Sequence, residues 1–171
     1  SRFRKNSPHP EDRRYVYRPP MSPMPGQASG GIGGRNVDIV AKVTYKKGDE
    51  GVLYASGTQN SGVSVFIQNG RLLLDYNAFG DHTIIESSGL VPEGDHELRA
   101  VLRRGDGMSG YLEVTIDGVS GGSAEVSLYM RMISSVCCQA AMTRRPARWD
   151  AIFPAASVSA WHWRGRSCAG R

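Results

Sequence analysis

The fold is decided by residues 63–76, which read VSVFIQNGRLLLDY. Two apolar runs, 63–67 and 72–76, flank Asn69 and Gly70, and both of these residues tolerate the positive φ angles of a type I′ turn. The stretch therefore predicts a β-hairpin whose two strands are these apolar runs.

More strands are predicted on both sides of this hairpin. Residues 37–44 alternate between apolar and other side chains, as a half-buried strand does. Turn residues follow at short intervals, for example at 48–51, 92–95 and 117–118. The remaining strands are expected at residues 52–55, 82–86, 96–103, 111–116 and 125–130. Because no helical period is sustained between 37 and 130, the sequence predicts an all-β, antiparallel, jelly-roll-like sandwich.

The net charge of +5 is confined to the C-terminal segment. Six of the 21 Lys and Arg residues and one of the 16 Asp and Glu residues lie in 137–171, so the rest of the chain is neutral. All three Cys and all three Trp lie there too. This shift predicts a Pro/Gly-rich extended segment at 1–36, a β-sandwich domain at 37–136 and an Arg/Trp/Cys-rich tail at 137–171.

The distribution of apolar residues argues against two classes of protein. No run approaches the ~18 apolar residues of a membrane helix. The N-terminal residues are polar, Pro-rich and basic, unlike a secretory signal. We therefore expect no membrane partner and, by default, a cytoplasmic location.

Four stretches resemble a concanavalin/laminin-G-like sandwich. They are GVLYASGT at 51–58, VFIQNGRL at 65–72, LDYNAFG at 74–80 and GYLEVTIDG at 110–118. Together with YRPPMSPMP at 17–25 and MRMISS at 130–135, they resemble the C-terminal region of bacterial arylsulfatases. The resemblance covers residues 12–136 and implies a C-terminal accessory fragment of a sulfuric ester hydrolase.

The catalytic motif of that family has no match in this chain. Sulfatases use a Cys or Ser in the motif Cys/Ser-x-Pro-x-Arg, which is oxidised to formylglycine and attacks sulfur beside a divalent metal. None of the three Cys, nor Ser7 or Ser22, has Pro at +2 and Arg at +4. The resemblance thus implies a separate catalytic sulfatase domain that holds Ca²⁺ or Mg²⁺. For this chain we expect no cofactor and assign no catalytic residue.

Candidate binding residues gather in and after the predicted hairpin. They are Arg71, Tyr76, Phe79 and His82. These aromatic and polar side chains are candidates for a face that contacts a glycan, a sulfate ester or the catalytic domain of the parent enzyme. The alternative is that the aromatic residues serve in core or cross-strand packing, which the same alternating positions fit.

The same stretch contains a candidate Ca²⁺ site. Asp75, Asn77 and Asp81 lie around Gly80, and oxygen ligands at such spacing suit Ca²⁺. The alternative is that Asp75 and Asn77 are the polar positions of a strand and that Gly80 and Asp81 form a turn. A glycosidase would need a pair of carboxylates, for which Asp75 and Glu86 are the candidates. We disfavour this interpretation, because the two acids form no paired motif on one strand.

The tail, residues 137–171, has three possible interpretations. Its Arg and Trp residues suit binding to a nucleic-acid strand. A metal or redox site would use Cys137, Cys138, Cys168 and His162, but adjacent cysteines chelate one ion poorly and no C-x-x-C motif occurs. We favour a frameshift in a GC-rich gene, because the composition changes abruptly after residue 135. We therefore expect no nucleic-acid partner.

The sequence leaves two functions open. The first is the accessory domain of an arylsulfatase-type hydrolase, inactive by itself. The second is a free-standing, lectin-like carbohydrate-binding module.

Overall fold

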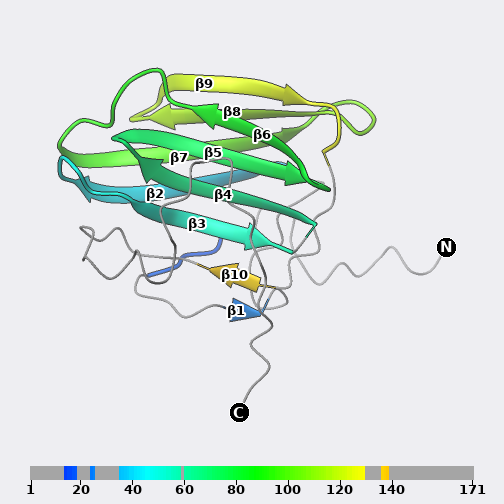
Figure 1. The fold of residues 1–171 in the computed structure, drawn as a ribbon, viewed down its shortest axis with the longest axis horizontal. Coiled ribbons are helices and arrows are strands. Elements are labelled where there is room, and N and C mark those ends of the chain that lie inside the picture. Colours follow the sequence, from blue (N-terminus) through cyan, green and yellow to red (C-terminus); the bar gives the residue numbers. More distant parts are fainter. Residues whose placement is uncertain (1–13, 19–23, 26–34, 59, 130–135, 139–171) are drawn as a thin grey trace, which may run out of the picture.

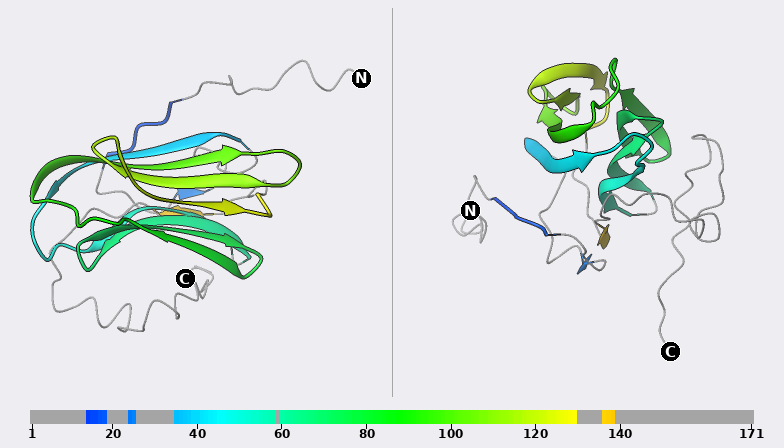
Figure 2. Two further views of the ribbon diagram at one scale, coloured as in Figure 1. Left: turned by 90° about the horizontal axis from the view of Figure 1, so that it is seen from above. Right: turned by 90° about the vertical axis from the view of Figure 1, so that its left-hand side faces the viewer.

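The computed structural model describes residues 14–18, 24–25, 35–58, 60–129 and 136–138. These residues form two antiparallel β-sheets, and no helix occurs among them (Figure 1). Figure 2 shows the sheets as two layers that lie face to face. The prediction of an all-β antiparallel sandwich is confirmed.

Each sheet contains strands that follow one another in the chain as hairpins, and connections between the sheets bring in the remaining strands. The six-stranded sheet contains, in spatial order, β1 (Met24–Pro25), β10 (Val136–Cys138), β3 (Gly51–Gly57), β4 (Ser61–Gln68), β5 (Arg71–Ala78) and β6 (Asp81–Glu86). The four-stranded sheet contains β2 (Val37–Tyr45), β7 (Gly94–Arg104), β8 (Gly110–Ile116) and β9 (Val119–Val126). The chain thus changes sheets after β1, after β2, after β6 and after β9.

The hairpin predicted from residues 63–76 is formed by β4 and β5. Its turn residues, Asn69 and Gly70, have φ angles of 51° and 74°, as a type I′ turn requires. The register pairs Gln68 with Arg71 on either side of this turn. Local turn chemistry and alternation were sufficient to predict this element.

The prediction of a strand at residues 125–130 is wrong. The turn after β8 leads directly into β9, which ends at Val126, and residues 127–129 lie outside any strand. The strand includes Gly121 and Gly122, which have low β-propensity. A Cβ atom on Gly122 would lie 2.8 Å from the backbone oxygen of Glu86. Glycine is therefore required by the close approach of β9 to β6, a tertiary contact that local propensity does not report.

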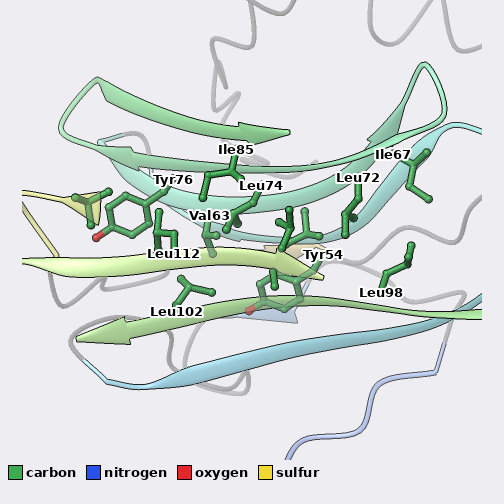
Figure 3. Close-up of a cluster of buried hydrophobic side chains, with 14 of the residues drawn as sticks. Tyr54, Val63, Ile67, Leu72, Leu74, Tyr76, Ile85, Leu98, Leu102 and Leu112 are labelled. Atoms are coloured by element: carbon green, nitrogen blue, oxygen red, sulfur yellow. The ribbon is translucent and has the colours of Figure 1, made fainter. Parts of the chain in front are cut away.

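The core lies between the two sheets (Figure 3). Alternate residues of the central strands point into it and are fully buried, among them Leu72, Leu74, Leu98, Leu102, Leu112 and Val114. One end of the core is closed by Tyr76 and Tyr129, whose rings stack with centroids 5.8 Å apart. The hydroxyl of Tyr129 donates a hydrogen bond to the carbonyl of Arg35 (2.7 Å), which ties the segment before β2 to this end.

The predicted N-terminal segment and tail are described only in part. Residues 14–18 form no strand, whereas β1 pairs with β10 and β10 pairs with β3. Strand β10 spans the expected boundary between residues 136 and 137. The rest of the tail, 139–171, to which the frameshift hypothesis mainly refers, lies outside the described residues. None of the described residues forms a helix that could cross a lipid bilayer.

Candidate functional site

Most of the candidate residues lie on the outer face of the hairpin formed by β5 and β6. In β5 the outward positions alternate with the core residues Leu72, Leu74 and Tyr76. The register then places the outward positions of β6 beside them. We call the accessible part of this surface the β5–β6 face; it comprises Arg71, Asp75, Asn77, His82, Ile84 and Glu86. Leu73, the remaining outward residue of β5 between Arg71 and Asp75, is buried.

Asp75 and His82 form a hydrogen-bonded pair on the β5–β6 face. The Nδ1 atom of His82 lies 2.9 Å from Oδ1 and 3.1 Å from Oδ2 of Asp75. The side chain of Asp75 is 14% exposed and that of His82 is 37% exposed. Because the carboxylate accepts from Nδ1, Nε2 is an acceptor in the neutral ring and a donor in the charged ring. The pair therefore offers an oriented polar group that can bind a ligand or a partner chain.

Arg71 is held by contacts within the chain. Its Nε lies 3.1 Å from Oε1 of Glu86. Its Nη1 donates hydrogen bonds to the carbonyls of Ser87 (2.6 Å) and Ser88 (2.9 Å). These bonds join the start of β5 to the end of β6. The Nε and Nη1 atoms of Arg71 are therefore already engaged within the chain before any ligand binds.

The two aromatic candidates lie elsewhere. Tyr76 is 1% exposed in the core, and its hydroxyl lies 3.3 Å from the carbonyl of Leu128. Phe79 is 66% exposed and has a φ angle of 56° in the turn between β5 and β6. The structure thus brings Arg71 and His82 to one face, places Tyr76 on the opposite side of β5 and places Phe79 at the end of the hairpin.

The residues of the candidate Ca²⁺ site have other partners. Asp75 faces Nδ1 of His82, and Oδ1 of Asn77 accepts a hydrogen bond from the backbone of Gly80 (2.7 Å). Asp81 is exposed. Within the described part of the chain, no three His, Cys, Asp or Glu residues are grouped so that they could hold a metal. Asn77 lies in β5, as the strand-and-turn alternative expects, but the turn is formed by Phe79 and Gly80, and Asp81 is the first residue of β6.

A second polar cluster was not found from the sequence. It lies where the turn between β8 and β9 meets the start of β7. Oδ2 of Asp117 lies 2.6 Å from Nδ1 of His96, and Oδ1 accepts a hydrogen bond from the backbone of Glu97 (2.8 Å). Beside it lies a shallow, open depression of about 410 Å³. Its lining residues are Lys42, Val43, Thr44, Asp95, His96 and Glu97.

The electrostatics of this cluster follow from the hydrogen bond between His96 and Asp117. That bond raises the pKa of His96 above its ordinary value of 6.5, against the smaller opposing effect of burial. It also lowers the pKa of Asp117 below 3.8, with help from the Glu97 N–H. The Nε2 atom of His96 is buried and makes no hydrogen bond. The backbone of Glu93 lies nearby and raises the pKa of His96 further, because it favours the charged ring.

Comparison with protein families and with curated proteins found no match. No protein-family model matches the chain. No curated protein matches it at a significant level. The resemblance to arylsulfatases therefore rests on the residues quoted above.

Proposed function

We propose that this chain is an accessory β-sandwich module of an arylsulfatase-type sulfuric ester hydrolase and that its β5–β6 face contacts the catalytic domain. The family is suggested by the residues shared with the C-terminal region of bacterial arylsulfatases. A supporting rather than catalytic role is suggested by the sequence, in which no position carries the Cys/Ser-x-Pro-x-Arg motif.

The observation that carries the proposal is the composition of the β5–β6 face. Ile84 is 44% exposed, and it is paired across the strands with Asp75. On one side of it lies the Asp75–His82 pair and on the other the Arg71–Glu86 ion pair. An apolar centre with a rim of oriented polar groups is the usual composition of a protein–protein interface. Because the polar groups are already held by one another, little side-chain freedom is lost on docking.

The first test concerns the partner. The DNA upstream of codon 1 should encode a sulfatase catalytic domain, in the same frame or in a broken one, and its absence there would contradict the proposal. The purified domain should bind this chain in titration calorimetry. The chain alone should not hydrolyse nitrophenyl sulfate, so turnover by the isolated chain would also contradict the supporting role.

The second test concerns the surface. Ile84→Glu should weaken binding to the catalytic domain about tenfold or more, because it puts a charge at the apolar centre of the interface. Val119→Glu is the matched control, since Val119 is 71% exposed and begins β9 in the other sheet. Equal loss of binding in both variants would show that the β5–β6 face is not the contact surface.

A lectin-like module is the second candidate function. It is favoured by the exposed ring of Phe79 in the same hairpin as His82, because ligand sites combine aromatic surface with a few fixed polar groups. On a glycan array, Phe79→Ala and His82→Ala should each abolish a signal that the unaltered chain gives. No signal from the unaltered chain would remove this candidate.

A further inference from the structure

Strand β2 forms a long, regular edge of the four-stranded sheet. All nine of its residues pair with β7 on one side, and no strand among the described residues pairs with it on the other. It contains no Pro, no Gly and no bulge. Such an edge presents a row of backbone N–H and C=O groups and favours pairing with another extended strand.

The side chains of β2 are also incompletely covered. The central inward positions of β7 and β8 are fully buried, namely Leu98, Ala100, Leu102, Leu112 and Val114. In β2 only Tyr45, at its end, is buried to this degree, and the other inward positions are half-buried. The half-buried positions are Val37, Ile39, Ala41 and Val43. On the outer face Val40 is 45% exposed. An added strand would bury apolar surface on both faces of the sheet.

The sequence of β2 is complementary to itself when two copies run antiparallel about Val40. In that register Asp38 of each copy lies opposite Lys42 of the other, and Val40 lies opposite Val40. Both charged residues lie on the outer face and are exposed. Opposite charges that face each other across neighbouring strands stabilise their pairing.

The two charged residues differ in their present contacts. The carboxylate of Asp38 lies 2.5 Å from Nη1 of Arg103 and 3.9 Å from Nη1 of Arg99. Lys42 makes no ion pair within the described part of the chain. The register places Lys42 opposite Glu97, whose carboxylate is bonded to Arg99 (2.9 Å). Asp38 of a second copy would therefore give Lys42 an ion-pair partner. A register centred on Ala41 would instead place Asp38 opposite Thr44 and lose both ion pairs.

We propose that two copies of this chain associate through β2 about a two-fold axis at Val40, which joins their four-stranded sheets into one continuous antiparallel sheet. A two-fold contact of this kind closes on itself and requires one self-complementary surface. The other described edge of this sheet suits pairing less well, because β9 contains Gly121 and Gly122 and its pairing with β8 is irregular. The inference is independent of the proposed function, since the β5–β6 face lies on the other sheet.

The test is the mass of the full chain in sedimentation equilibrium across a dilution series. The unaltered chain should form a dimer of twice 18.6 kDa. Val40→Asp should raise the dissociation constant about tenfold or more, because two carboxylates then meet on the axis. Its fold should persist, since the register places residue 40 beside Arg99, which can pair with the new carboxylate. Val119→Asp is the control and should remain dimeric.

The outcomes separate the alternatives. A monomer at every concentration would overturn the proposal and would indicate that β2 is unpaired or is covered by another part of the chain. A dimer unaffected by Val40→Asp would overturn it as well, because association would then use another surface. If Val40→Asp fails to fold by circular dichroism, Lys42→Ala replaces it. That variant should weaken the dimer several-fold and reduce its sensitivity to salt, and an unchanged dissociation constant would contradict the proposal.

Discussion

His96 and Asp117 join two strand ends of the four-stranded sheet through a hydrogen bond of 2.6 Å between Nδ1 and Oδ2. Asp117 also accepts from the backbone of Glu97 and donates its own N–H to the Glu97 carbonyl (2.8 Å each). The turn between β8 and β9 is thus fastened to the start of β7 by three hydrogen bonds, one of which depends on pH.

The stability of the protein should depend on pH through this pair. The raised pKa of His96 gives stabilisation that is complete below about pH 6.5 and is lost as the pH rises through the raised value. The lowered pKa of Asp117 gives stabilisation that is complete above about pH 3.8 and is lost as the pH falls through the lowered value. The pair therefore contributes most between these two limits.

Asp117→Asn isolates this effect. Asn tolerates the φ angle of 51° at this turn position, so the backbone should be retained while the charge is removed. Urea unfolding of both proteins across pH should show that the difference in unfolding free energy is largest in the weakly acidic range and shrinks in alkaline solution. A difference that does not vary with pH would contradict the assignment.

Gly70→Ala should destabilise the central hairpin by about 1–2 kcal/mol. The φ angle at Gly70 is 74°, and an added Cβ would lie 3.3 Å from the hydroxyl of Tyr45 and 3.4 Å from Cδ2 of Leu90. Gly89→Ala is the matched control, because an added Cβ there meets no atom within 4 Å. Thermal unfolding of the two variants should differ clearly, and equal melting temperatures would count against the turn geometry.

Substitutions of Tyr76 should separate packing from binding. Tyr76→Ala should cost about 3–5 kcal/mol of unfolding free energy, as the loss of a buried aromatic ring does. Tyr76→Phe keeps the ring and removes the hydroxyl with its hydrogen bond to the carbonyl of Leu128, so it should cost about 1 kcal/mol. A fully stable Tyr76→Ala variant would show that the ring does not support the core.

Arg71→Gln should loosen the connection between β6 and β7. The substitution removes the ion pair with Glu86 and the hydrogen bonds to the carbonyls of Ser87 and Ser88. We expect a loss of about 1–2 kcal/mol in unfolding free energy, because hydrogen bonds from a charged donor are worth more than neutral ones. Hydrogen exchange should accelerate at Ser87 and Leu72, whose amides bond near this contact, and unchanged exchange there would argue against the role.

The candidate surface was predicted in part. Alternation placed Asp75 and Asn77 on one side of a strand, and the structure brings His82 beside them through the register of β5 and β6. The same alternation could not tell which side of β5 would face the second sheet. Tyr76 was therefore a candidate for binding as well as for packing until the position of the opposite sheet placed it in the core.

The sequence by itself determined the class of the fold and the positions of its tight turns. Asn69-Gly70 and Asp117-Gly118 each bend the chain through local preferences for positive φ, which need no distant contact. Only the tertiary structure decided the extent of β9 and the pairing of His96 with Asp117. Gly122 belongs to a strand because it pairs with Val114 of β8, and it must be glycine because β6 passes close to it. The residues of the His96–Asp117 pair are 21 positions apart and meet because the register of β7 and β8 brings them together. Interactions of this kind depend on which strands become neighbours, and that information is not carried by any short stretch of the chain.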